Sequence, residues 1–154
     1  MFRVAIAAGT EIGRKVQPIL ASGELVPDEL TVALIRDRLS NDDTAQGFVL
    51  DGFPRNLVQA RELDEMLEAI GRPLDVVFYF DLDDDTATER MLGRAREEGR
   101  ADDTPEVIAR RLAIYHEHTE PVVERYREAG TLVDLDAARS IDDVSAEIEM
   151  ALAR

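Results

Sequence analysis

Arginines at defined spacings are the residues of this sequence best suited to chemistry on anionic groups. Of its 18 basic residues only Lys15 is a lysine, and the guanidinium of arginine grips phosphate or carboxylate with two parallel hydrogen bonds. Arg90 and Arg94 share one helical face, Arg100 follows in a predicted loop, and Arg111 lies on the next predicted helix. A GC-rich genome is the simpler explanation for the arginine excess, and acids of the same segment could neutralise these four side chains at a solvated surface. Those acids are Glu97, Glu98, Asp102 and Asp103.

A second group, Asp51-Gly52-Phe53-Pro54-Arg55, follows the short apolar run 48–50. In sheets of parallel strands, ligands bind where the strands end. Glycine would let a ligand approach the backbone, proline would fix the turn, and Arg55 would clamp a phosphate. An ordinary strand-to-helix turn with a surface arginine has the same pattern, so this stretch alone leaves both interpretations open.

Alternating helical and strand patterns predict the elements that position these residues. Apolar spacing and capping residues predict helices near 12–22, 26–39, 56–70, 83–94 and 140–152. A long helix is predicted from Thr104 onward, with a bend or restart at Pro121. Short apolar runs predict buried strands at 48–50, 76–80 and 131–135. The order indicates an α/β fold with a doubly wound parallel sheet in one domain, 1–154, although three strands are few for it. The charged stretch 95–103 is predicted to be an exposed loop.

Composition limits the partners. The net charge of −15 argues against general nucleic-acid binding, since polyanions are held by basic surfaces. No segment has the apolar length of a membrane span, so a cytoplasmic protein is expected. There are no cysteines, and no structural zinc is expected. His116 and His118 have no carboxylate pattern that would indicate chemistry.

Two phrases give the chain a resemblance to a known family. The stretch 23–30, Gly-Glu-Leu-Val-Pro-Asp-Glu-Leu, and the stretch 47–55, Gly-Phe-Val-Leu-Asp-Gly-Phe-Pro-Arg, with Gln59 beyond, resemble the monophosphate site of adenylate kinases. A second region is similar to the short-lid bacterial form of the family. It consists of Gly93-Arg94 and the stretch 99–104, with Arg111 and Tyr115-His116 downstream. The resemblance implies the P-loop nucleoside monophosphate kinase fold. It also implies an AMP-binding helical subdomain at 1–40 and a short lid at 95–103.

The resemblance implies a role for each matching position. Binding of the AMP phosphate falls to Arg3 and Arg55, and contacts with the AMP base and ribose fall to Glu24, Leu25, Val26, Gly52, Phe53, Pro54 and Gln59. Binding of ATP falls to Arg90, Arg94 and, least securely, Arg139. Arg100 and Arg111 contact AMP and bridge to the transferring phosphate, so Arg55, Arg90, Arg94, Arg100 and Arg111 are the expected catalytic set. Asp51 orients Mg²⁺ through water, and the partners are ATP, AMP and ADP.

The chain departs from the family at its beginning. Adenylate kinases open with a strand, a Gly-rich loop ending in Gly-Lys and a helix, in which loop amides hold the ATP phosphates. Here Met1-Phe2-Arg3-Val4 resembles the middle of the first AMP-domain helix, and Lys15 lies in no such loop. We expect the first strands and the P-loop to be missing, so that transfer between ATP and AMP is impaired. We expect a monomer for the full-length kinase and possible association for the shortened chain, whose strands at 48–50 and 76–80 lose a partner.

Two alternatives stay open. One is a non-catalytic AMP-binding or regulatory module, although the retained lid arginines argue against it. The other is a kinase for another nucleoside monophosphate, although Gln59 favours adenine.

Overall fold

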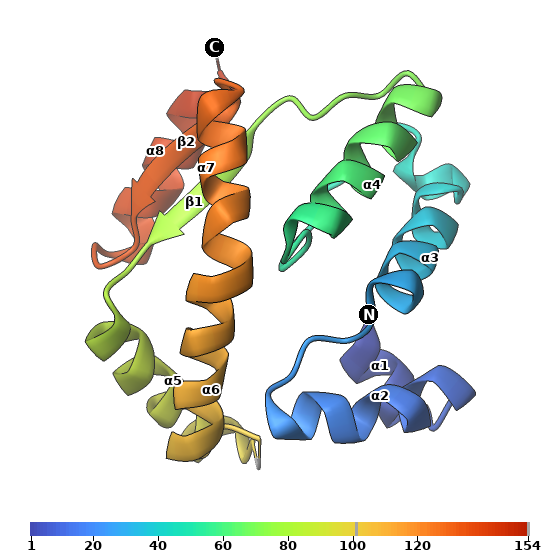
Figure 1. Ribbon diagram of the computed structural model, residues 1–154. Helices are drawn as coiled ribbons and strands as arrows, with labels where there is room; N and C mark the ends of the chain where they lie inside the picture. Colours follow the sequence, from blue (N-terminus) through green and yellow to red (C-terminus); the bar gives the residue numbers. More distant parts are fainter. Residues whose placement is uncertain (101, 154) are drawn as a thin grey trace.

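The computed structural model describes residues 1–100 and 102–153. Figure 1 shows helices α1 to α4 on one side of the molecule, the two strands with α7 and α8 on the other, and α5 and α6 below them. The predicted α/β class is confirmed, because the described residues combine many helices with a small parallel sheet.

The first four helices form the part that contains residues 1–70. They are α1 (Phe2–Ala7), α2 (Glu11–Ser22), α3 (Asp28–Leu39) and α4 (Leu57–Ala69), with a 3₁₀ turn η1 (Asp42–Thr44) after α3. As predicted, α2 ends at Gly23, which is left-handed at φ 80° and so suits glycine. Apolar side chains of α3 and α4 share one core with Phe53. These core residues are Val32, Ile35, Leu39, Leu63, Met66 and Leu67.

The predicted strand at 48–50 is wrong for this structure. These residues have no strand partner and Val49 is 92% exposed, although Phe48 and Leu50 pack against the α3–α4 core. A strand needs a neighbour for its backbone N–H and C=O groups. Within the described residues no strand lies beside this run, so it stays irregular despite its apolar composition.

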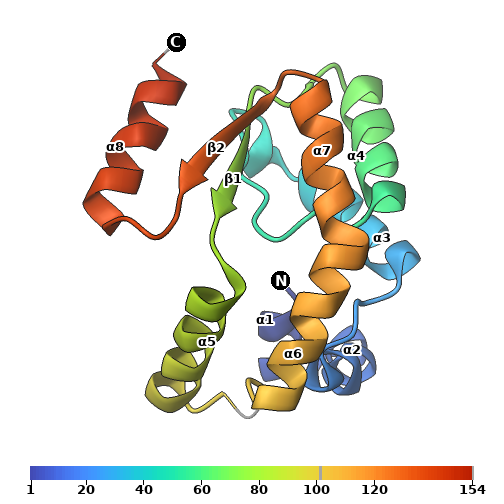
Figure 2. The ribbon, with the colours of Figure 1, turned by 60° about the vertical axis from the view of Figure 1, so that its left-hand side comes forward.

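The sheet consists of β1 (Val77–Asp81) and β2 (Leu132–Asp136), which pair in parallel with Val77 opposite Leu132 and Asp81 opposite Asp136. In Figure 2, α7 (Glu120–Glu128) and α8 (Ile141–Leu152) lie on opposite sides of the two strands. The prediction that the strand at 76–80 is buried fails for its end, because Phe80 is 52% exposed. Leu152, at the end of α8, is also exposed.

The crossover between the strands is helical. The helix α5 (Asp84–Glu98) is followed by α6 (Pro105–Ile114), a π-helical turn η2 (Tyr115–Thr119) and α7. Pro121 lies in the first turn of α7, so the helix restarts there as predicted. The predicted loop 95–103 begins later than expected, since 95–98 continue α5 up to the left-handed cap at Gly99. Ala101, within the predicted lid, lies outside the described residues.

One small core joins these parts. Val122 and Tyr126 of α7 pack against Ala60 of α4, with Val77 and Leu132 of the sheet at the margin. The Tyr126 hydroxyl and Arg125 both donate to Asp64 of α4, at 3.3 and 2.6 Å. Within the described part of the chain, no helix has the length and apolar character needed to cross a membrane.

Candidate functional site

The turn from Asp51 to Arg55 is held by side chains that donate to its backbone carbonyls. Gly52 has a φ of 70°, and a Cβ at this position would come within 2.9 Å of the Arg55 guanidinium. Arg55 folds back over the turn and donates from Nε to the Gly52 carbonyl at 2.7 Å. On the far side, the Thr119 hydroxyl of η2 donates to the Arg55 carbonyl at 2.8 Å. The turn therefore requires glycine at position 52 and is tied to the crossover helices.

Arg55 lies in an environment that suits an anion. Arg55 is exposed at the surface, but the atoms around its guanidinium remove some of its solvation. This desolvation, and then the positive charge of Arg111, lower the pKa of Arg55, while Asp51 opposes the shift. Its own hydrogen bond from Nε goes to a backbone carbonyl rather than to a carboxylate. Two arginines from distant parts of the chain thus repel each other here, and a bound anion would relieve that repulsion.

The carboxylate of Asp103 lies at the centre of the arginine cluster and its side chain is fully buried. Arg94 of α5 donates to Asp103 Oδ2 from Nε at 3.0 Å and from Nη2 at 2.8 Å. Arg111 of α6 donates to Asp103 Oδ1. A buried carboxylate of this kind is tolerated because two guanidinium groups satisfy it.

Asp102 extends the cluster to the first helix. Its Oδ2 accepts from Arg3 of α1 at 2.8 Å and from Arg111 at 2.7 Å. Burial favours the neutral acid, but the hydrogen bonds and charges of Arg3 and Arg111 outweigh it and lower the pKa of Asp102 to about 2. The pair Asp102 and Asp103 therefore gathers arginines from α1, α5 and α6 in one place.

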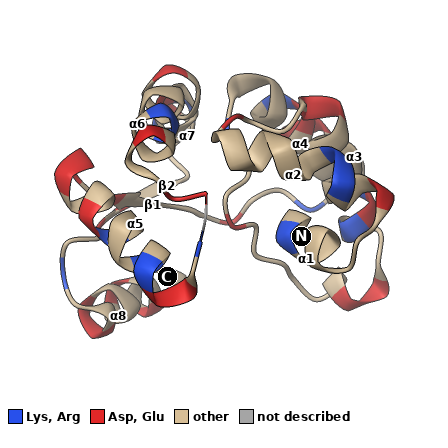
Figure 3. Cartoon of the chain, turned by 90° about the horizontal axis from the view of Figure 1, so that it is seen from below, with Lys and Arg blue, Asp and Glu red and all other residues tan. Residues whose placement is uncertain are grey.

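The helical segment 1–40 also touches α6 directly. Arg111 donates to the Leu20 carbonyl at 3.4 Å, and Glu24 forms an ion pair with Arg110 at 3.2 Å. A Cβ on Gly23 would lie 3.0 Å from Val107 Cγ1, so the end of α2 packs closely on α6. Figure 3 shows acidic and basic residues interspersed on both sides of the molecule, and this contact joins the two sides.

A polar network at the junction of α3 and α4 was not predicted from the sequence. Asp28 Oδ1 accepts from the Asn56 amide and from the Gln59 amide, both at 2.8 Å. Asn56 also caps α4 by accepting from the Gln59 backbone N–H, and Gln59 accepts from the Arg55 backbone N–H, each at 2.8 Å. The sequence signal that could have indicated this network is the pair of helix starts. One has an acid in the first turn of α3, and the other has an asparagine just before α4.

Some predicted residues lie apart from this cluster. Arg90 is exposed on α5, Arg100 pairs with Glu98 at 2.6 Å, and both ion-pair partners of Arg139 lie on α8. Of the predicted base contacts, Val26 and Phe53 are buried and Leu25 and Pro54 are half-buried. The alternative interpretation, in which nearby acids neutralise the arginines, is correct for Glu98, Asp102 and Asp103, which all form ion pairs with arginines. It is wrong about the setting of Asp103, whose side chain is buried and not part of a solvated surface.

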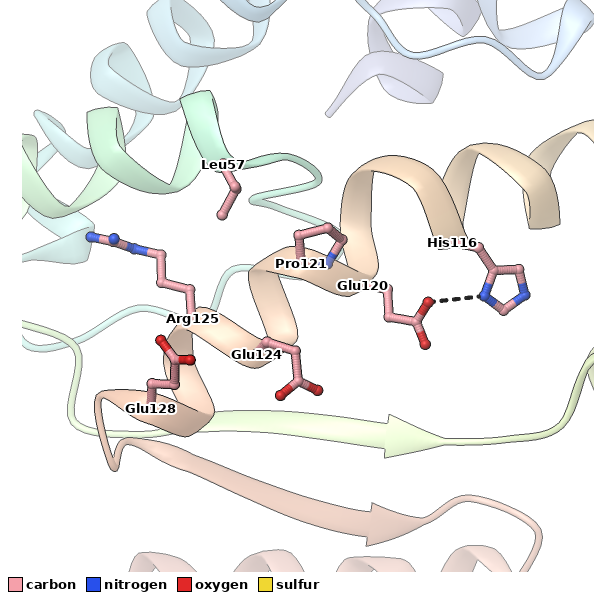
Figure 4. A pocket seen from close by; sticks show the side chains of 7 residues that line it. All are labelled: Leu57, His116, Glu120, Pro121, Glu124, Arg125 and Glu128. Carbon is pink, nitrogen blue, oxygen red and sulfur yellow. Dashed lines mark hydrogen bonds and ion pairs between the residues drawn. The ribbon is translucent and has the colours of Figure 1, made fainter.

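A cavity of about 610 Å³ lies elsewhere, between the start of α4 and α7. Figure 4 shows its lining, in which Glu120 contacts His116 and the other two glutamates of α7, Glu124 and Glu128, accompany a single arginine, Arg125. His116 contacts Asp84 at 3.0 Å and Glu120 at 3.3 Å. The hydrogen bond with Asp84 has the larger effect and that with Glu120 the next, and together they raise the pKa of the His116 imidazole. An acidic lining does not suit a phosphate-bearing ligand, and none of its residues belongs to the predicted site.

The chain is also similar in sequence to known proteins. The sequence model of the adenylate kinase family matches residues 1–131. An adenylate kinase of Kocuria rhizophila is 48% identical over 100% of this chain and 82% of its own length. That of Thermobifida fusca is 46% identical over 99% of this chain and 80% of its own. That of Stenotrophomonas maltophilia strain K279a is 43% identical over 99% and 81%.

The parallel β1–β2 pair with helices on both sides is consistent with the fold of P-loop nucleoside monophosphate kinases, with two strands in the part of the chain that the structure describes. Within that class, the chain belongs to the adenylate kinase family.

Proposed function

We propose that the arginine cluster and the turn from Asp51 to Arg55 bind AMP and close over ATP. They take part in the reversible transfer of a phosphoryl group, which converts ATP and AMP into two ADP. The observation that carries the proposal is the gathering of Arg3, Arg94 and Arg111 around Asp102 and Asp103. Arg55 belongs to the same region, because desolvation and then the positive charge of Arg111 lower its pKa. Transfer between two polyanions depends on positioning and on neutralising charge, and converging arginines supply both.

Each group of residues has a part in this proposal. Arg3 and Arg55 bind the AMP phosphate, while residues 24–26, residues 52–54 and Gln59 contact its base and ribose. Arg90 and Arg94 bind ATP phosphates, with Arg139 near the ATP base, and Arg100 and Arg111 contact the group in transit. The bond between the transferred phosphoryl group and the leaving ADP breaks as a bond from that group to an AMP phosphate oxygen forms. Nucleotide phosphates would replace the carboxylates of Asp102 and Asp103 as partners of the arginines.

Mg²⁺ is the metal that the family implies, and the residues present fit an indirect role. Within the described residues no group of three or more carboxylate or imidazole side chains could hold a metal ion directly. Asp51 is exposed at the turn that carries Arg55, and Mg²⁺ commonly keeps its waters while one carboxylate and the substrate phosphates orient it. When bound, the ion neutralises charge on the phosphates.

The ATP phosphates need a further partner. A Gly-rich loop ending in Gly-Lys does not occur within the 154 residues, and the single lysine, Lys15, lies in α2 and pairs with Glu11 at 2.6 Å. We therefore propose that these residues by themselves transfer phosphate weakly or not at all. A cytoplasmic location, where the substrates are made and used, is part of the same proposal.

The test is a coupled assay of ADP formation from ATP, AMP and Mg²⁺. It compares the 154-residue chain with a chimera that adds a strand-loop-helix unit carrying the Gly-rich loop ending in Gly-Lys. We expect activity in the chimera alone, and equal activity in both would refute the proposed need for the loop. A chimera that binds AMP without transferring phosphate would instead indicate a binding module.

Arg55→Ala tests the AMP site in the 154-residue chain by calorimetric titration with AMP. Loss of a charge-assisted hydrogen bond, about 1.5–3 kcal/mol, should weaken AMP binding by about 10- to 100-fold. Arg61→Ala is the matched control, because Arg61 is an exposed arginine of α4. Equal affinities of the two variants would contradict the role of Arg55.

A further inference from the structure

We propose that Asp28 is a positioning residue that fixes the orientation of the Gln59 amide and thereby the base that the monophosphate site accepts. The inference rests on the proposed function, because Gln59 selects a base only if this site binds a nucleoside monophosphate. It adds a determinant of base selectivity that lies on α3, outside the predicted set of site residues.

The contacts of Gln59 distinguish the two ends of its amide. Its Oε1 accepts from the Arg55 backbone N–H, and its Nε2 donates to Asp28 Oδ1, each at 2.8 Å. An N–H can only donate and a carboxylate can only accept. Reversing the amide would place NH₂ against N–H and oxygen against a carboxylate, so both contacts would become repulsive.

The same logic holds for the neighbouring amide of Asn56. Its Oδ1 accepts from the Gln59 backbone N–H, and its Nδ2 donates to the same Asp28 oxygen. Asp28 therefore orients two amides at once, and Gln59 is only 2% exposed within this network. A buried network in which every member has a partner holds its groups in one arrangement.

The fixed amide has one remaining proton on Nε2 and one remaining lone pair on Oε1. The pairing edge of adenine offers an amino donor beside a ring-nitrogen acceptor, which this pair of groups matches. Hypoxanthine has the reverse order, with a carbonyl acceptor beside an N–H donor, and would face two mismatched contacts. The amide alone does not reject cytosine, whose edge has the same order as adenine, so the size of the site would have to do so.

Because Gln59 is nearly fully covered, a base must displace part of its cover before it contacts the amide. A network that keeps the amide oriented during this exposure would preserve the selectivity. If Asp28 were only a tie between α3 and α4, its loss would instead weaken binding of every nucleotide to the same extent.

The test is the ratio of the dissociation constants for IMP and AMP, measured by calorimetry on the 154-residue chain. These two ligands differ only at the edge that Gln59 would contact. Asp28→Ala should lower the ratio about tenfold, the equivalent of one hydrogen bond. Asp28→Asn should largely preserve it, since one side-chain oxygen can still accept from both amides. Glu29→Ala, the next residue and also an exposed acid in the first turn of α3, should leave it unchanged.

The outcomes separate this inference from the proposed function. AMP binding that depends on Arg55, together with a ratio that Asp28→Ala does not change, would overturn the inference alone. Failure of the wild-type chain to bind AMP would overturn both. If Asp28→Ala does not fold, the side-chain amide of Gln59 in the wild-type chain provides the test by NMR. Its protons should exchange far more slowly than those of exposed Gln17, and equal exchange would overturn the inference.

Discussion

Replacing Asp103 with asparagine should lower the free energy of unfolding by about 3 kcal/mol. The wild-type carboxylate is fully buried and accepts two hydrogen bonds from Arg94 and one from Arg111. Asparagine has nearly the same shape but retains only one oxygen and presents an NH₂ group to a guanidinium. Losing about two charge-assisted hydrogen bonds, each about 1.5–3 kcal/mol, gives about 3–6 kcal/mol. The side chains of Arg94 and Arg111 are 35% and 23% exposed. Solvent around them reduces the loss of unfolding free energy toward about 3 kcal/mol, the lower end of this range.

The assay is urea unfolding followed by far-ultraviolet circular dichroism, with stability taken from the midpoint and slope. For a chain of this size about 3 kcal/mol corresponds to a fall in the melting temperature of about 6–12 °C. Glu98→Gln is the control, because its pair with Arg100 is exposed on the Glu98 side and such pairs contribute about 0–1 kcal/mol. If Asp103→Asn costs no more than Glu98→Gln, the buried cluster does not stabilise the fold as argued here.

Two further perturbations follow from the same region. Because the pKa of Asp102 falls from 3.8 to about 2 on folding, its contribution of about 2 kcal/mol is complete above about pH 5 and is lost as the pH falls through about 2. Acid titrations of unfolding free energy should show this loss in the wild type and a smaller one in Asp102→Asn. Gly23→Ala should destabilise the chain by about 2 kcal/mol or more, since φ is 80° and Val107 lies 3.0 Å from the new Cβ. A thermal melt of this variant that matches the wild type would contradict the close packing of α2 on α6.

Local patterns were sufficient for most of the helices. Gly23 ends α2, Asn56 caps α4 and Thr104 caps α6, as the capping residues predict. The charged stretch 95–98 predicts a loop, but in the structure it continues α5. Alanine, arginine and glutamate are good helix formers, and the helix continues until Gly99.

The failures concern partners that the local sequence does not contain. The run 48–50 has the composition of a buried strand, but a strand exists only when another strand pairs with it. The contact between Arg3 and Asp102 joins residues 99 positions apart, so no spacing rule predicts it. The sequence placed these arginines in one family site by resemblance, whereas only the structure shows which carboxylates hold them.

The π-helical turn at Tyr115–Thr119 restricts insertions and deletions in this part of the chain. It joins α6, whose Arg111 faces the acid pair, to α7, whose Val122 and Tyr126 face α4 and the sheet. Each residue of a helix advances the direction of its side chains by roughly 100°. A single-codon deletion in this turn would therefore rotate one of these two faces away from its partner. Alleles of this gene should tolerate substitutions at 115–119 far more readily than changes in length.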